Sequence, residues 1–254
     1  MTTSGPRTPR YGIARVLSKR GLCSRTQAAG WVRAGRVSIG GRVVRDPEFP
    51  VALDRDDIAV DGGALAGNTP GIAVPLYLML NKPRGLITTT NDERGRDTVY
   101  SCFDGVTHEG LPLPWIAPVG RLDKASEGLL LFSNDTQWAA RIADPDTGPH
   151  KTYHVQIDRL PDDELLSVLS AGIDDGGERL SAVSATVLRT GQKNAWLQIV
   201  LDEGRNRQIR RLLSAFEIET LRLVRVAIGG LLLGDLPKGQ WRALDAQDMA
   251  RIHY

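Results

Sequence analysis

One aspartate in a polar loop is the first residue of this sequence that could do chemistry. Asp123 lies in the stretch GRLDKASEGLLLFSND, residues 120–135, where polar residues lead directly into an apolar strand. A carboxylate at the edge of an apolar strand has restricted solvation, so its surroundings can tune its basicity. The same pattern also fits a structural role, in which Asp123 caps a turn and pairs with Arg121 or Lys124. The residues alone leave both roles open.

A second candidate is the arginine-rich stretch DEGRNRQIRRLL, residues 202–213. It is typical of a strand that ends at Gly204 and of a helix over 205–216 with one buried apolar face. Positive charge in the first turns of a helix opposes the helix dipole, which indicates a phosphate or carboxylate partner. A solvated basic face is the alternative. The basic residues expected on this face are Arg207, Arg210 and Arg211.

Three segments, in their order and spacing, resemble the core motifs of RNA pseudouridine synthases. They are GRLDKASEGLLLFSND, KTYHV at 151–155 and EGRNRQIRRL at 203–212. NKPRG at 81–85 and GQWR at 239–242 resemble the branch of this family that modifies ribosomal RNA. The resemblance extends over nearly the whole chain from about residue 10 onward. Without the resemblance, Tyr153 would indicate only a half-buried residue on a strand.

The resemblance implies a role for individual residues. Asp123 would be the catalytic aspartate, and Arg121 would help to displace the target base from the RNA. Tyr153 would stack on the target uracil, and Arg210 would pair with the catalytic carboxylate. Whether that carboxylate attacks the sugar or removes a proton from it stays open. Further RNA contacts are expected from Arg205, Arg207 and Arg211.

The N-terminal segment has an unusual distribution of charge. Between Met1 and Arg45 there are nine Arg and one Lys but no Asp or Glu. Uncompensated charge of one sign repels itself, which indicates a polyanion as partner; a face that only aids solubility is the alternative. Ile13, Val16 and Leu17 have the spacing of one face of a helix. Ser24 can cap a second helix, and Gly40–Gly41 can form the turn of a hairpin.

This segment resembles the alpha-L RNA-binding motif, first known from a ribosomal protein of the small subunit. The residues GLCSRTQAAGWVRAGRVSIGGRVV carry the resemblance, which covers 10–62. Arg forms paired hydrogen bonds with phosphate oxygens, so helices of this kind suit RNA backbone contacts. The residues expected to bind RNA here are Arg15, Lys19, Arg25 and Arg33.

The sequence predicts an α+β protein in four parts. These are a flexible tail (1–9), the alpha-L RNA-binding domain (10–62), a Gly-, Pro- and Ala-rich linker (63–75) and a catalytic domain (76–254). The catalytic domain is expected to hold a mixed, mainly antiparallel sheet. Its expected strands are 76–80, 128–132, 152–157, 195–201 and 223–228. Its expected helices are 136–143, 162–171 and 205–216.

Composition narrows location and partners. No apolar run is long enough to span a bilayer and the N-terminus has no signal-peptide pattern, so we expect a cytoplasmic protein without a membrane partner. A monomer is the expected oligomeric state. Cys23 and Cys102 are expected as free thiols. Isomerisation of uridine adds no group and changes no redox state, so neither metal nor organic cofactor is expected. Ribosomal RNA is the expected partner, with the large subunit favoured over the small.

Three other classes of protein compete with this interpretation. A non-catalytic RNA-binding or ribosome-assembly protein would need the basic N-terminal segment but not Asp123, Tyr153 and Arg210 together. An RNA methyltransferase would need a methyl-donor site, and the sequence has no Gly-rich strand–loop–helix for one. A glycoside hydrolase would need a second carboxylate, for which Glu127 is the candidate, but the arginine-rich surroundings favour a phosphate-bearing substrate.

Overall fold

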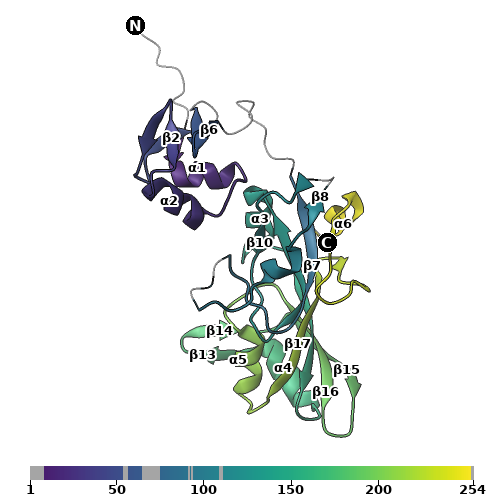
Figure 1. The fold of residues 1–254 in the computed structure, drawn as a ribbon. Coiled ribbons are helices and arrows are strands. Elements are labelled where there is room, and N and C mark those ends of the chain that lie inside the picture. Colours follow the sequence, from purple (N-terminus) through teal and green to yellow (C-terminus); the bar gives the residue numbers. More distant parts are fainter. Residues whose placement is uncertain are drawn as a thin grey trace. The chain divides into compact units, whose positions relative to one another are not determined.

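The chain divides into two compact units (Figure 1). The computed structural model describes residues 9–53, 57–64, 75–90, 92, 94–108 and 111–252. The first unit is Met1–Leu76 with Val106–Ala117, and the second is Tyr77–Gly105 with Pro118–Tyr254. The stretch 106–117 therefore groups with the N-terminal unit, whereas the predicted boundaries counted it in the catalytic domain. The predicted tail, except for residue 9, and most of the predicted linker lie outside the described residues.

Two short helices and small sheets form the N-terminal unit, as predicted. Helix α1 spans Ile13–Lys19 and α2 spans Arg25–Arg33. Ser24 begins α2 with a capping box, because its hydroxyl accepts from the Gln27 N–H while the Gln27 side chain accepts from the Ser24 N–H. A pair of strands is formed by β1 (Arg10–Gly12) and β4 (Pro50–Ala52). The four-stranded sheet has the order β3 (Arg42–Val44), β2 (Val37–Ile39), β5 (Ile58–Val60) and β6 (Gly63–Ala64), so it reaches into the predicted linker.

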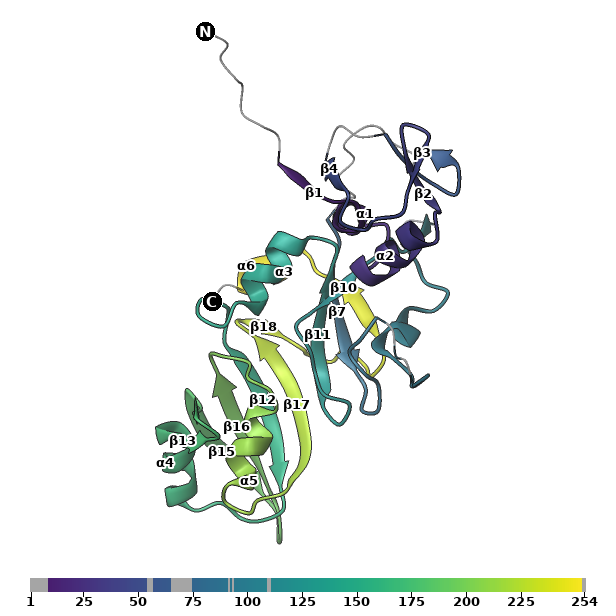
Figure 2. The same cartoon turned by 90° about the vertical axis from the view of Figure 1, so that its left-hand side faces the viewer.

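The second unit is built on one mixed sheet, whose strands β12, β16 and β17 can be followed in Figure 2. Its main path runs β15 (Ser184–Thr190), β16 (Ala195–Leu201), β12 (Lys151–Ile157), β17 (Thr220–Ile228), β11 (Glu127–Ser133), β7 (Tyr77–Lys82) and β19 (Trp241–Ala243). Strand β10 (Ala117–Val119) pairs with β11, and β18 (Leu231–Leu232) pairs with β17. Along the main path every neighbouring pair is antiparallel except β11 and β17. The prediction of a mainly antiparallel sheet is confirmed.

Helices and a short hairpin complete the unit. The helices are α3 (Thr136–Ala143), α4 (Asp163–Ala171), α5 (Gln208–Ser214) and α6 (Ala246–Arg251), with a 3-10 helix at Val99–Phe103. A hairpin joins β13 (Ile173–Asp175) to β14 (Glu178–Leu180). A second hairpin, of β8 (Thr107–His108) and β9 (Leu111–Pro112), lies in the stretch that groups with the N-terminal unit. Helix α3 packs Trp138 and Ile142 against Met79, Leu129 and Leu131 of the sheet. All five predicted strands and the helices at 136–143 and 162–171 are present within a few residues.

The predicted helix over 205–216 is shorter than expected. Helix α5 begins at Gln208 because Arg207 adopts the left-handed conformation, with φ 51° and ψ 31°. A left-handed residue cannot continue a right-handed helix toward the N-terminus. Arg205 and Arg207 therefore lie in the loop before α5 and not on the helix, which corrects the prediction that Arg207 shares a helical face with Arg210 and Arg211.

The parallel pairing of β11 with β17 involves two residues of each strand, and the two backbones approach each other closely at Gly128. It joins Glu127 to Val224 and Gly128 to Arg225. Gly128 has a φ of 101°, and a Cβ at this position would lie 2.2 Å from the carbonyl oxygen of Arg225. Only glycine fits such an approach. The pairing places the loop that precedes β11 beside β17 and β12.

Two expectations from composition concern the whole chain. Cys23 and Cys102 are both free, as expected. Among the helices that the structure describes, none has both the length and the apolar character needed to cross a membrane.

Candidate active site

A cavity of about 610 Å³ opens in the second unit where the loop before β11 meets β12, β17 and the loop before α5. This volume lies in the range of small-ligand sites. Its walls carry three carboxylates, Asp123, Asp146 and Glu203. They also carry six cations, which are Arg121, Lys151, Arg205, Arg207, Arg210 and Arg225. The excess of positive charge favours an anionic ligand.

The last residue of β7, Lys82, and Thr88 in the segment after it hold the Asp123 loop in place. The Lys82 side chain is fully buried, and its Nζ donates to the carbonyls of Pro83, Asp123 and Ser126 at 3.1, 3.2 and 2.8 Å. Thr88 accepts from the Leu122 N–H and donates to the Leu122 carbonyl. Burial lowers the pKa of Lys82 to about 8, although the negative charge of Asp123 opposes this shift. The loop is therefore fixed by backbone contacts that leave the Asp123 carboxylate free to face the cavity.

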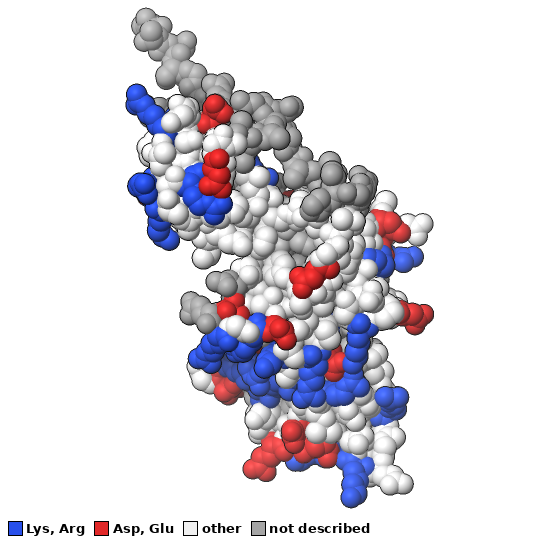
Figure 3. All heavy atoms as spheres, in the orientation of Figure 1, with Lys and Arg blue, Asp and Glu red and all other residues white. Residues whose placement is uncertain are grey.

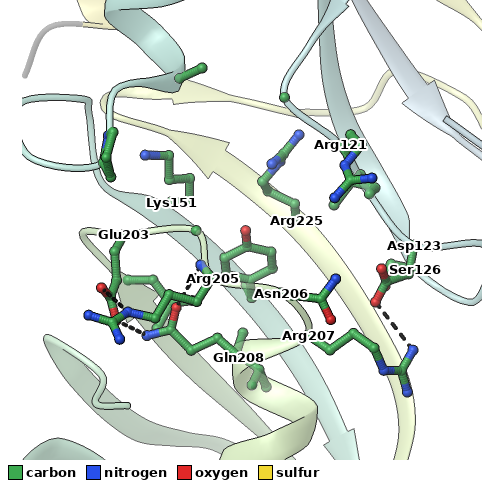
Figure 4. Close-up of a pocket in the computed structure, with 18 of the residues that line it drawn as sticks. Arg121, Asp123, Ser126, Lys151, Glu203, Arg205, Asn206, Arg207, Gln208 and Arg225 are labelled. Atoms are coloured by element: carbon green, nitrogen blue, oxygen red, sulfur yellow. Dashed lines mark hydrogen bonds and ion pairs between the residues drawn. The ribbon is translucent and has the colours of Figure 1, made fainter. Parts of the chain in front are cut away.

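Asp123 forms an ion pair with Arg207. Arg207 Nη1 lies 3.4 Å from Asp123 Oδ2, and Figure 4 shows the two side chains facing each other at one end of the cavity. Both are partly exposed, with 37% of the Asp123 side chain and 51% of the Arg207 side chain accessible. The left-handed backbone of Arg207 turns this residue out of the helix and toward the carboxylate.

Arg210 does not make the contact predicted for it. Its guanidinium donates to the carbonyls of Thr220 at 3.2 Å and Ala125 at 3.4 Å, and its Nε is buried without a partner among the described residues. Burial lowers the pKa of Arg210, Arg207 lowers it further, and Asp123 opposes both. Arg210 is close enough for its charge to act on Asp123, but Arg207 makes the direct ion pair because it lies outside the helix.

The cavity also brings Tyr153 and Arg121 to the same place as Asp123. Tyr153 lies on β12 opposite Arg225 of β17 and is 8% exposed. Arg121 is exposed at the rim of the Asp123 loop. An aromatic ring and two polar groups around one space suit a planar heterocyclic ligand that also carries hydrogen-bonding edges.

Besides Arg207, two predicted RNA contacts of the second unit have carboxylate partners. Arg205 pairs with Glu203 at 2.6 Å beside the cavity. Arg211 pairs with Asp175 and Glu178 of the β13–β14 hairpin, each at 2.6 Å, so α5 directs it away from Asp123. Figure 3 shows Lys and Arg gathered in a band across one face of this unit, at the level of α5. The surface of this unit is therefore basic at the level of α5, although Arg211 is partly neutralised.

The N-terminal unit presents its predicted RNA contacts on its surface. Arg15 and Lys19 lie one turn apart on α1, both over the ring of Tyr11, at 5.1 and 4.4 Å. Arg25 pairs with Glu48 at 3.2 Å on an exposed site, a contact too exposed to be strong. Arg33 at the end of α2 is exposed.

Four residues of the site received no role from the sequence. They are Lys82, Lys151, Gln208 and Arg225. Gln208 is 2% exposed and donates to Glu203 and to the Ser181 carbonyl, which fixes the loop before α5. The sequence could have indicated a role for Arg225, because an arginine within the apolar strand sequence LVRVAI must either bury its charge or face a binding site.

Comparison with known proteins places this geometry in a family. Residues 76–215 match the family described as RNA pseudouridylate synthase, and residues 12–57 match the S4 domain. The chain is 31% identical over 242 residues to Ribosomal large subunit pseudouridine synthase B of Bacillus subtilis, which covers 94% of each protein. It is 33% identical over 247 residues to the protein of that name from Escherichia coli strain K12, covering 95% of this chain and 81% of that one.

A solved structure described as a crystal structure of pseudouridylate synthase is similar over the same length. It has 26% sequence identity and a TM-score of 0.63, and the match covers 95% of this chain and 99% of that one. The family match spans more than half of the chain, and the alignments span nearly all of it. The chain therefore belongs to the RNA pseudouridine synthases with an N-terminal S4 domain, and it is an isomerase.

Proposed function

We propose that this enzyme converts a specific uridine of ribosomal RNA to pseudouridine and that Asp123 is its catalytic carboxylate. The observation that carries the proposal is the meeting of Asp123, Tyr153 and Arg207 in one cavity of cationic character. A protein that only bound RNA would have no use for a carboxylate in a basic cavity, because a carboxylate repels phosphate.

The reaction defines what the cavity must do. The bond between N1 of uracil and C1′ of ribose breaks, the freed uracil turns, and C5 bonds to C1′. C5 then loses its proton and N1 gains one, so no atom is added or removed overall. A base stacked within RNA hides these atoms, so the uridine must leave the stack. We assign Arg121 to filling the vacated space and Tyr153 to stacking on the uracil.

Asp123 must be ionised at the moment of reaction, both if it attacks C1′ and if it removes a proton from the sugar. A cation at its side favours the charged form when the bound RNA excludes water. Arg207 supplies the ion pair in the free enzyme at 3.4 Å, and Arg210 lines the same cavity with its side chain held by two carbonyls. We assign both arginines to this electrostatic role, with Arg207 in direct contact.

Large-subunit ribosomal RNA is the target we favour. The relatives at 31% and 33% identity are named as synthases of the large ribosomal subunit, and their similarity extends over the S4 domain as well. We infer that the N-terminal unit binds RNA through Arg15, Lys19, Arg25 and Arg33. The location that fits this partner is the cytoplasm, and small-subunit RNA is the second candidate target.

Mapping pseudouridine in ribosomal RNA tests the proposal. Cells that lack this protein are compared with cells restored with the wild type or with Asp123→Asn. We expect one large-subunit position to lose pseudouridine and only the wild type to restore it. Loss at a small-subunit position would move the target, and an unchanged map of both subunits would contradict ribosomal RNA as the substrate.

A further inference from the structure

Four of the six cavity cations form no ion pair within the described residues, namely Arg121, Lys151, Arg210 and Arg225. Two of these four, Lys151 and Arg225, lie on neighbouring strands of the sheet. Lys151 begins β12 and Arg225 lies on β17, and both line the cavity that contains Asp123. Lys151 Nζ donates to the carbonyl of Asp202 at 3.5 Å. Within the described residues neither side chain forms an ion pair, whereas Arg205, Arg207 and other arginines nearby do.

Arg225 holds its charge in an environment that water hardly reaches. The residue is 5% exposed. Its Nε donates to the Leu129 carbonyl at 2.7 Å, and its Nη2 is buried with no hydrogen-bond partner in the described part of the chain. A buried charged donor without a partner is unfavourable, so a group that supplies oxygen atoms is expected at this position in a functional complex.

Lys151 and Arg225 act on each other across neighbouring strands. Strand β12 aligns Tyr153 with Arg225 and Lys151 with Ile228. Burial lowers the pKa of Lys151, and the charge of Arg225 lowers it further, against the weaker pull of Asp202 and Asp144. Figure 4 shows the two side chains along one wall of the cavity, across from Arg207 and Gln208. Two cations on the same wall of a cavity repel each other, and an anion bound between them would offset this repulsion.

We propose that Lys151 and Arg225 together bind a backbone phosphate adjacent to the target uridine. A phosphodiester has two non-bridging oxygens, which suit one ammonium and one guanidinium group. Tyr153 lies opposite Arg225 and two residues after Lys151 on β12, and all three line the cavity. A uridine whose base stacks on Tyr153 would therefore carry its phosphate close to this pair. The inference rests on the proposed function, and it adds an anchor that positions the nucleotide without touching the reacting bond.

Binding of small nucleotides to the full chain tests the inference. Uridine, uridine 5′-monophosphate and uridine 3′-monophosphate are titrated by NMR at low salt into the wild type and into Lys151→Gln. We expect at least one monophosphate to bind about tenfold more tightly than uridine to the wild type. Lys151→Gln should abolish most of this gain and leave uridine affinity within twofold. Lys193→Gln, which removes an exposed positive charge outside the cavity, should keep the full gain.

Two results would overturn the inference: equal affinity of the wild type for uridine and both monophosphates, or an unchanged gain in Lys151→Gln. Arg225→Lys is the second variant, and its thermal unfolding is measured first because Arg225 also holds the Leu129 carbonyl. Isomerisation is measured separately, as release of tritium from C5 of uridine in RNA. The protein could bind a monophosphate more tightly than uridine, in a way that depends on Lys151, and yet show no isomerase activity on ribosomal RNA. That result would support the phosphate site and reject the proposed substrate.

Discussion

Arg207 and Asp123 lie 84 residues apart in the sequence and form an ion pair with 3.4 Å between Nη1 and Oδ2. Arg207 reaches the carboxylate because its own backbone is left-handed and helix α5 begins only after it, at Gln208. The pair is partly exposed, so in the free enzyme it adds little stability, about 0–1 kcal/mol. Its strength will rise when RNA covers the cavity and lowers the local dielectric constant.

The two arginines near Asp123 are expected to differ when mutated. Arg207→Gln should slow single-turnover isomerisation by about 10–100-fold and leave thermal unfolding unchanged, since its ion pair is exposed. Arg210→Met should destabilise the fold by about 1–3 kcal/mol, because the carbonyls of Ala125 and Thr220 lose their donor. If Arg210→Met slows the reaction without unfolding and Arg207→Gln does not, Arg210 is the cation that pairs with Asp123 in the RNA complex.

Asp123→Asn should abolish isomerisation, with at least a 10³-fold loss of rate, and leave RNA affinity within a few fold. The amide keeps the shape of the side chain but can neither attack C1′ nor accept a proton. Tritium release from C5 of uridine measures the rate, and a filter-binding titration measures affinity. Asp235→Asn, an exposed carboxylate outside the cavity, is the matched control and should keep wild-type activity. Activity in Asp123→Asn would remove Asp123 from the catalytic role.

Gly128→Ala should destabilise the second unit by several kcal/mol, about 3 or more, because the new Cβ would meet the Arg225 carbonyl oxygen at 2.2 Å and the residue has a φ of 101°. Gly234→Ala is the matched control. Gly234 also has a positive φ, 59°, but no atom lies within 4 Å of its Cβ position, so only about 1 kcal/mol is expected. Urea unfolding compares the two variants, and equal losses would mean that the close approach of β11 and β17 is not required.

The lowered pKa of the buried Lys82 should make the stability of the fold depend on pH. Its pKa is about 8 in the folded chain, against an ordinary value of 10.5 when unfolded, so the unfolded chain binds more protons between these limits. The wild type should therefore gain about 1–3 kcal/mol of stability relative to Lys82→Met as pH rises from 8 to 10.5, with the difference constant below pH 8. Urea midpoints at several pH values measure this. Lys193→Met is the control, and parallel curves for wild type and Lys82→Met would contradict the burial of a charged lysine.

Reversing charge on α1 should weaken RNA binding without affecting the chemistry. Arg15→Glu with Lys19→Glu should lower affinity and reduce the slope of log K against log salt by about 1–2, since each phosphate contact contributes about 0.7–0.9. Binding is titrated at several salt concentrations, and isomerisation is measured at saturating RNA. A charge reversal at Lys193 serves as control. An unchanged salt slope in the double variant would show that α1 does not contact the RNA.

The sequence was informative where a local rule determines structure. Ser24 caps α2 and Gly40–Gly41 turns its hairpin, as predicted, because caps and tight turns depend on a few adjacent residues. The meeting of Asp123 with Tyr153 could be expected only from the family resemblance, which assigned the ion pair with Asp123 to Arg210 and not to Arg207. The left-handed Arg207 was missed because no rule of propensity favours arginine there. Arg225 and Lys151 were assigned no role because their meeting depends on the pairing of β12 with β17, which the sequence does not specify.

The short parallel contact between Glu127–Gly128 and Val224–Arg225 also has a consequence for biogenesis. These partners are separated by almost a hundred residues, and contacts of such high order form late because a long loop must close first. A ribosome-bound chain that has emerged only as far as β16 already contains Asp123 and Tyr153 but lacks Arg207 and Arg225. The aspartate acquires its cations only when the last third of the domain has emerged. Catalytic competence therefore marks the completion of folding, and unfinished chains hold an inert carboxylate.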